Sequence, residues 1–173
     1  MTLRVCLTGV ESTGKSRLAP RLAAKFGGIT MPEYGREWAE TNGLDFTTAA
    51  LREIAATHVA RRMALEAAAP RLIVEDTDVV MTSAWQFMLY GSRDALLSAM
   101  PADADLYLLM SPDTPWIEDG TRQFSGTDRL RFASAVSEEL QQRGIRAVTI
   151  GGDWRARFMA AQAAIQLLGL EPV

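Results

Sequence analysis

The residues that most directly indicate chemistry lie near the N-terminus, in the segment Gly9–Ser16, which reads GVESTGKS. The segment matches G-x-x-x-x-G-K-[ST], the pattern of a loop whose backbone N–H groups wrap around phosphates at the start of a helix. In such a loop Lys15 reaches the β- and γ-phosphates, and the hydroxyl of Ser16 ligates Mg²⁺. Lys15 is also one of only two lysines in the chain, which indicates a specific demand for a compact cation. The sequence therefore predicts binding of ATP or GTP together with Mg²⁺.

The expected contacts to the nucleotide extend beyond this loop. Arg17 follows the loop directly, and Arg157 ends the segment Gly151–Arg157, where an arginine or Trp154 could stack on the base. A helix start capped by Asp153 explains that segment equally well. The residues expected to bind the nucleotide are Gly9, Glu11, Ser12, Thr13, Gly14, Lys15, Ser16, Arg17 and Arg157.

A second group of polar residues follows the apolar run Leu72–Val74, which ends in Glu75-Asp76-Thr77-Asp78. In phosphate-loop proteins an Asp at a strand end holds Mg²⁺ opposite the loop Ser, and Asp76 is the best candidate here. Asp78 lies two residues further on and would point the same way if the strand continues, toward a substrate. Its alternative role is to cap the helix that follows.

The segment Pro32–Glu37 follows another strand-like run, and it offers groups for an acceptor substrate. Ligands of open parallel sheets bind beyond the carboxyl ends of the strands, so we expect Glu33 to face the same crevice as the phosphate loop. A carboxylate there can accept a proton from a hydroxyl, and Arg36 can hold a phosphate or a substrate group. A surface ion pair is the alternative for Arg36.

A polar, glycine-containing segment at about residues 112–128, here called the lid segment, includes Trp116–Arg122. If it is mobile, Arg122 would bring positive charge onto a transferring phosphoryl group; an ordinary surface loop is the alternative. Tyr34, Trp85 and Trp116 lie close to these motifs and would supply aromatic walls for an acceptor, although core packing also explains Trp85.

Short apolar runs alternate with helix-like segments along the chain, which predicts an α/β fold with a parallel sheet. We expect a single domain over residues 1–173. The expected strands are Arg4–Thr8, Gly28–Pro32, Leu72–Glu75, Asp105–Met110 and Arg146–Ile150. The expected helices are Lys15–Phe26, Thr48–Ala69, Val79–Tyr90, Leu130–Arg143 and Arg155–Leu168.

Composition narrows the class of protein further. With a net charge of −3 and scattered basic residues, the chain lacks the electrostatic footprint of a nucleic-acid partner. No stretch is apolar over the roughly 20 residues that a membrane span needs. Cys6 is the single cysteine and His58 the single histidine, so we expect no disulfide, no metal cluster and a cytoplasmic location. The sequence carries no indication of an oligomeric state.

Four motifs together resemble one known family: Gly9–Ser16, Glu33–Glu37, Asp76–Asp78 and Trp116–Arg122. In this order and at similar spacing they resemble the nicotinamide riboside kinase domain of the bifunctional NadR proteins, within the NadR-like group of AAA-type P-loop ATPases. The resemblance covers essentially the whole chain. It implies a three-layer P-loop fold with a five-stranded parallel sheet in the order 2-3-1-4-5 and helices on both faces. It also implies transfer of the ATP γ-phosphoryl group to the 5′-hydroxyl of nicotinamide riboside, giving nicotinamide mononucleotide.

The resemblance and the residue patterns together define the expected site. The expected catalytic residues are Lys15, Glu33, Asp76 and Arg122, and the expected Mg²⁺ ligands are Ser16 and Asp76. The expected substrate contacts are Glu33, Tyr34, Arg36, Asp78, Trp85, Trp116 and Asp119.

Pro32 stands where the family has an aromatic residue before the Glu, a departure that bears on the acceptor rather than on the fold. Nothing matches the DNA-binding or adenylyltransferase regions of the bifunctional proteins. The alternatives are a kinase for another nucleoside or small alcohol, and a nucleotide-dependent ATPase or GTPase switch.

Overall fold

The apolar runs of the sequence form one parallel sheet in the computed structural model, which describes residues 2–120 and 122–173. Thr121, which belongs to the expected lid segment, lies outside the described residues. The sheet has five strands in the order β2-β3-β1-β4-β5, as the family resemblance implied. The strands are β1 Leu3–Thr8, β2 Ile29–Met31, β3 Leu72–Asp76, β4 Leu106–Met110 and β5 Ala147–Ile150.

The central strands are buried on both faces, which is why they read as continuous apolar runs rather than as alternating patterns. β1 and β3 are neighbours, and their register places Leu7 beside Asp76. The carboxyl ends of β1 and β3 therefore meet at one edge, so the phosphate loop that follows β1 begins next to the acids that end β3.

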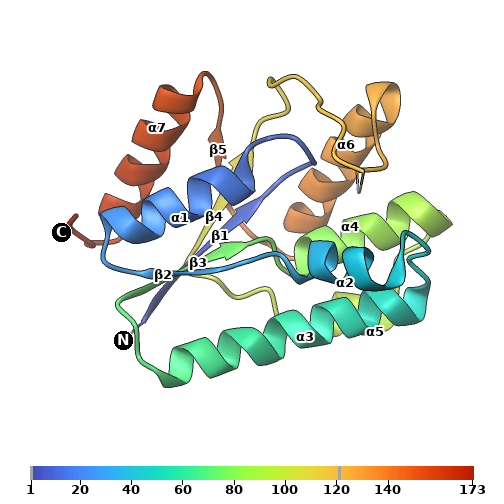
Figure 1. The fold of residues 1–173 in the computed structure, drawn as a ribbon, viewed down its shortest axis with the longest axis horizontal. Helices are drawn as coiled ribbons and strands as arrows, with labels where there is room; N and C mark the ends of the chain where they lie inside the picture. The colour runs from blue at the N-terminus through green and yellow to red at the C-terminus, as the bar shows by residue number, and fades with distance from the viewer. Residues whose placement is uncertain (1, 121) are drawn as a thin grey trace.

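Helices cover both faces of the sheet (Figure 1). α1 and α7 pack on one face, and α3, α4 and α6 lie on the other. The helices are α1 Lys15–Lys25, α2 Tyr34–Asn42, α3 Thr48–Ala67, α4 Val79–Tyr90, α5 Ala95–Ala99, α6 Gly126–Gln142 and α7 Trp154–Gln166. In the described part of the chain, none of them combines the length and the apolar character that a membrane span requires.

Most helix boundaries follow the local signals of the sequence. α4 begins after its N-cap Asp78 and ends at Gly91, which adopts a left-handed conformation with φ of 68°. Two short helices were not predicted, α2 and α5, and α6 begins at Gly126 rather than at Leu130. α2 follows Glu33, whose side chain makes no capping hydrogen bond, so the usual local start signal is absent.

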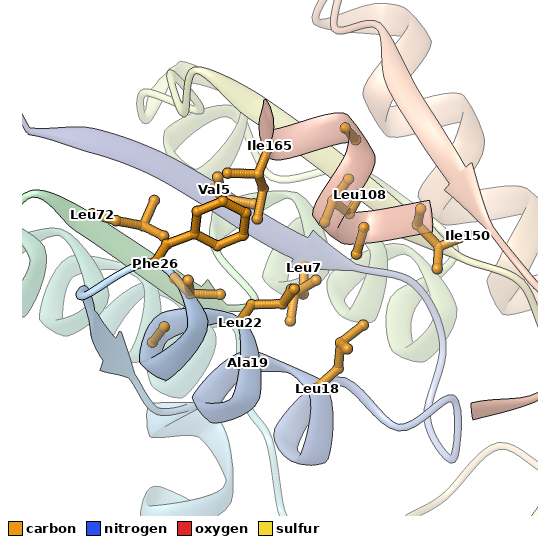
Figure 2. Close-up of a cluster of buried hydrophobic side chains, with 14 of the residues drawn as sticks. Val5, Leu7, Leu18, Ala19, Leu22, Phe26, Leu72, Leu108, Ile150 and Ile165 are labelled. Atoms are coloured by element: carbon orange, nitrogen blue, oxygen red, sulfur yellow. The ribbon is translucent and has the colours of Figure 1, made fainter. Parts of the chain in front are cut away.

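The larger core lies between the sheet and the pair α1 and α7 (Figure 2). Figure 2 shows Leu22 of α1 beside the strand residue Leu7, and Phe26, which follows α1, near Val5 and Leu72, with Ile165 of α7 on the same side of the sheet. This packing fixes the first helix, and with it the phosphate loop, against the sheet.

We predict that Leu22→Ala lowers the free energy of unfolding by about 2–5 kcal/mol, because the Leu22 side chain is fully buried and its removal leaves a cavity. Leu167→Ala is the matched control, since Leu167 is 89% exposed and should change stability by less than about 0.5 kcal/mol. Urea unfolding followed by circular dichroism measures both. Equal losses in the two variants would contradict this assignment of the core.

Candidate active site

The phosphate loop joins β1 to α1 in a conformation that only glycine adopts readily at two positions. Gly9 has φ of 118°, and a Cβ atom there would lie 2.7 Å from the carbonyl oxygen of Met110. Gly14 has φ of 85° at the N-terminus of α1, where a Cβ atom would lie 2.3 Å from the ring of Trp154. The two glycines therefore let the loop turn sharply over the ends of the strands.

Lys15 is folded back into this loop and is only 8% exposed. Its Nζ atom donates to the carbonyl oxygens of Gly9 at 2.7 Å and Val10 at 2.9 Å. Burial lowers the pKa of Lys15, while the nearby charges of Asp76 and Glu33 raise it. The ammonium group is thus held within the loop and beside two carboxylates.

A cavity of about 150 Å³ opens beside the phosphate loop. Its lining includes the loop and the start of α1, together with the charged residues Glu33, Arg36 and Arg122. Another wall is largely apolar and comes from α2, α3, α4 and the connection between α2 and α3; its residues are Ala39, Phe46, Leu51, Ile54, Met81 and Trp85. The cavity therefore joins a phosphate-binding surface to a pocket suited to a flat, weakly polar group.

Aromatic rings form a continuous row along that apolar wall. The ring of Phe46 lies between those of Trp38 and Trp85, with centroid distances of 5.3 Å and 5.2 Å. Trp85 in turn packs on Phe124 of the lid segment at 4.8 Å, and Phe124 packs on Phe132 of α6 at 5.0 Å. The row thus connects α2, α4, the lid segment and α6.

Asp76 ends β3 and is buried, with 3% exposure. Its Oδ1 atom accepts no hydrogen bond from any described residue, although buried carboxylate oxygens are normally paired. Asp76 lies close enough to Lys15 and Glu33 for its charge to influence the pKa of both. The unpaired carboxylate oxygen of Asp76 and the hydroxyl of Ser16, which borders the cavity, are of the ligand types that suit a hard cation such as Mg²⁺.

Glu33 sits at the N-terminus of α2 with a side chain that is 28% exposed and faces the cavity. Burial, followed by the negative charge of Asp76, raises the pKa of Glu33 to about 7, while Lys15 and Arg36 oppose the shift. The carboxyl group is therefore poised to exchange a proton near neutral pH.

His58 of α3 holds the segment that carries Glu33. Its Nε2 atom accepts a hydrogen bond from the backbone N–H of Tyr34 at 2.9 Å, which fixes the first turn of α2. Burial, together with the charge of Arg61, lowers the pKa of His58 to about 4, so the imidazole is neutral and can act as an acceptor. The sequence assigned His58 no role in the site, because nothing local shows which backbone group its side chain meets.

The lid segment carries a chain of charges over the cavity. Asp119 pairs with Arg36 of α2 at 2.8 Å and with Arg122 at 3.1 Å. Arg122 also donates to the carbonyl oxygen of Ile117, and its charge influences the pKa of Lys15. The ion pair expected as the alternative for Arg36 is therefore present, and it joins α2 to the lid segment while Arg36 still borders the cavity.

Besides Asp119, three of the expected substrate residues lie outside the lining of the cavity. Asp78 caps α4 by accepting from the N–H of Val80 at 2.9 Å, and it accepts the hydroxyl of Tyr107 at 2.5 Å. Thr77 has φ of 71°, so the strand alternation stops there and Asp78 does not continue the face of Asp76. These contacts favour the capping alternative for Asp78.

Tyr34 and Trp116 are the other two. Tyr34 stacks under the guanidinium of Arg61, which lies 4.4 Å from the ring centroid. Trp116 is half-buried in the lid segment, and neither side chain borders the large cavity. Trp85 and Phe46 take their place as its aromatic walls; Phe46 was not predicted, since it belongs to a loop with no motif.

Arg157 also differs from expectation. It is 1% exposed, and its guanidinium donates to the carbonyl oxygens of Gly152 at 2.8 Å and Ser111 at 3.1 Å. Arg157 thus supports the loop ends, and it also lines a second cavity together with Gly14 and Trp154. Asp153 caps α7, as the alternative reading proposed. The exposed Arg17 remains at the cavity and also lies 5.6 Å from the ring centroid of Trp154.

A phosphate loop between the central strand and the first helix, in a parallel sheet of this order, defines a P-loop nucleotide-binding fold. Within that class the chain belongs to the AAA domain family, whose model matches residues 4–157. The NadR-like resemblance is confirmed by curated relatives. The trifunctional NAD biosynthesis/regulator proteins NadR of Escherichia coli and Salmonella typhimurium are each 30% identical to it over 164 residues. These matches cover 90% of the chain but only 40% of either relative.

Solved structures agree on the fold. A NadR protein in complex with NAD and AMP-PNP has a TM-score of 0.73 at 19% identity, covering 96% of this chain and 49% of that one. A NadR protein in complex with NR has a TM-score of 0.75 at 19% identity, covering 99% and 51%. The thymidylate kinase of Ehrlichia chaffeensis has a TM-score of 0.64 at 15% identity, covering 96% and 98%. The three-layer P-loop fold is thus shared with kinases.

We predict a pH-dependent contribution of His58 to stability. Because the pKa of His58 falls to about 4 in the folded protein, its contribution is present above the ordinary value of 6.5 and is lost as the pH falls from there through 4. The effect reaches about 3 kcal/mol. His58→Gln keeps an oxygen acceptor for the N–H of Tyr34 but does not titrate, so the variant should lose less stability over this window.

Urea unfolding at several pH values between 7 and 4 measures the difference, and His58 is the only histidine in the sequence, so no other imidazole contributes. Parallel stability curves for the two proteins would show that His58 is not buried as a neutral acceptor.

Proposed function

We propose that the chain is an ATP- and Mg²⁺-dependent kinase that phosphorylates the 5′-hydroxyl of nicotinamide riboside to give nicotinamide mononucleotide. The observation that carries the proposal is a single cavity that joins the phosphate loop to Glu33, a carboxylate with a pKa of about 7. A switch that only hydrolyses its nucleotide needs no such pocket beside the loop. The relatives support the substrate class, because NadR is named for NAD biosynthesis and a NadR structure contains NR.

The reaction follows from the positions of the charged groups. The acceptor hydroxyl oxygen forms a bond to the γ-phosphorus as the bond to the β,γ-bridging oxygen breaks, and Glu33 takes the hydroxyl proton. Lys15 and Arg122, which both line the cavity, stabilise the charge on the transferred group and on ADP.

Mg²⁺ fits the remaining oxygen groups. Ser16 and Asp76 would hold the ion, and it would supply positive charge to the phosphate oxygens. The buried Oδ1 atom of Asp76, which no described residue satisfies, is the feature that favours this assignment.

The residues at the acceptor end of the cavity also support a substrate with a positively charged ring, although fewer acids lie there than the sequence suggested. Glu11 and Glu33 are the acids that border the cavity among the described residues, whereas Asp78 faces away and Asp119 is paired with arginines. Recognition of the positive nicotinamide ring would therefore rest on Glu33 and on the faces of Phe46 and Trp85, since aromatic rings attract cations. The same apolar wall favours the alternative, a kinase for a neutral nucleoside.

We predict that nicotinamide riboside is phosphorylated with a higher kcat/KM than uridine, cytidine, adenosine or thymidine. A coupled assay of ADP formation across this panel, with and without each acceptor, measures the preference. Lys15→Ala, which removes the phosphate-binding ammonium, serves as the control for contaminating kinases and should lose nearly all activity. A higher kcat/KM for a neutral nucleoside would assign the protein to that substrate, and acceptor-independent ATP hydrolysis would indicate a switch.

We also predict that kcat/KM rises with pH through about 7, because Glu33 must be deprotonated to accept the hydroxyl proton. Glu33→Gln should lower kcat by roughly 10²–10⁴-fold and remove this rise. Glu37→Gln is the matched control, since Glu37 lies on the same helix but is exposed and paired with Arg61.

Asp78→Asn tests whether Asp78, rather than Glu33, accepts the hydroxyl proton. We expect it to keep an acceptor oxygen for the cap of α4, to lower the melting temperature by weakening the bond from the hydroxyl of Tyr107, and to leave the pH profile unchanged. A profile that flattens in Asp78→Asn but persists in Glu33→Gln would reverse their roles.

A further inference from the structure

The phosphate loop contains an acid, Glu11, at a position where the motif accepts any residue. Glu11 borders the large cavity and lies close enough to Lys15 for its charge to raise the pKa of that ammonium. A carboxylate beside the phosphates repels them, so it works against the main task of the loop. Its presence therefore requires another task.

The carboxylate of Glu11 binds backbone groups of the lid segment. Its two oxygens accept the N–H of Gln123 at 3.2 and 3.3 Å, and Oε2 also accepts the N–H of Phe124 at 3.2 Å. These bonds join positions more than a hundred residues apart in the sequence. Bonds from amides to a carboxylate are charge-assisted and stronger than bonds between neutral groups.

The other end of the lid segment is attached to the same loop. The Oγ atom of Ser12 accepts the N–H of Ile117 at 2.8 Å, and the carbonyl oxygen of Ser12 accepts the hydroxyl of Thr114 at 2.7 Å. Arg129 of α6 donates to the carbonyl oxygens of Thr114 at 2.7 Å and Glu11 at 3.3 Å. Arg122 thus lies between two attachments to the phosphate loop, one through Ser12 and one through Glu11.

The attachment through Glu11 acts on a part of the lid segment that is already anchored. Phe124 is 9% exposed, and its ring packs on Trp85 and Phe132. With its ring in the core and its amide bound by Glu11, Phe124 has little freedom to rotate. The backbone of Arg122, two residues earlier, is therefore restrained as well. The side chain of Arg122 borders the cavity.

We propose that Glu11 is a positioning residue whose carboxylate holds the backbone of Gln123 and Phe124 and thereby places the guanidinium of Arg122 at the phosphoryl-transfer end of the cavity. The kinetic part of this inference rests on the proposed kinase function, whereas its structural part does not. Glu11 acts through Arg122, and ATP binding does not require a contact between Glu11 and the nucleotide. Its removal should loosen the lid segment and slow transfer while leaving ATP bound at least as tightly.

Hydrogen exchange in the protein without ligands tests the structural part. In Glu11→Ala the amides of Gln123 and Phe124 should exchange at least about tenfold faster, the factor expected for losing charge-assisted bonds. Glu11→Gln retains one acceptor oxygen and should lie between Glu11→Ala and the unchanged protein. Glu53→Ala, an exposed acid on α3, is the matched control and should leave these amides unchanged. Unchanged exchange in Glu11→Ala would overturn the proposal.

A double-mutant cycle with Arg122→Ala tests the kinetic part. If Glu11 acts through Arg122, Glu11→Ala lowers kcat in the unchanged protein but causes no further loss in Arg122→Ala. Independent losses that multiply in the double variant would overturn this coupling. Calorimetric titration with AMP-PNP should give a Kd that is unchanged or lower in Glu11→Ala; a tenfold weaker Kd would assign Glu11 to nucleotide binding instead.

The two parts fail separately. If no nucleoside is phosphorylated, the proposed kinase function fails, whereas the exchange rates and the AMP-PNP titration still decide whether Glu11 holds the lid segment.

Discussion

A buried ammonium group is costly unless oxygen atoms surround it, and the ligand edge of this protein is arranged around that requirement. Lys15 receives two carbonyl oxygens because Gly9 lets the chain turn tightly beside Met110. It receives negative charge from Asp76 because β1 and β3 are neighbours in register. The same proximity contributes to the raised pKa of Glu33, whose largest cause is burial. The sheet order and the shape of the phosphate loop therefore both serve to stabilise the buried charge of Lys15.

The sequence predicted the features that depend on local patterns. All five strands and the phosphate loop lie where apolar runs and glycine spacing indicated, and α4 has the predicted bounds Val79–Tyr90. α2 was missed because its start depends on a distant group, the imidazole of His58, rather than on a capping side chain. Local patterns do not encode such a contact, although each partner is visible separately.

The site was predicted in part, and for a similar reason. Glu33, Arg36, Trp85 and Arg122 come together at one cavity as their positions after strands and near the motifs suggested. Asp78 does not, because the expectation assumed a continued strand, and the left-handed turn at Thr77 breaks the alternation of side chains. Arg157 likewise supports backbone carbonyls that no sequence pattern reveals. The experiments described above test the roles of these residues in nucleotide binding and phosphoryl transfer.

The row of aromatic rings along the cavity has a consequence for how the protein can evolve. Phe46 and Trp85 line the cavity beside the phosphate loop, and Trp85 also packs on Phe124 of the lid segment, two residues after Arg122. A mutation of Trp85 that changes the shape of the pocket therefore also changes the packing of Phe124, whose backbone is close in sequence to Arg122. Selection acting on the pocket at Trp85 would thus act at the same time on the packing of Phe124 and Phe132.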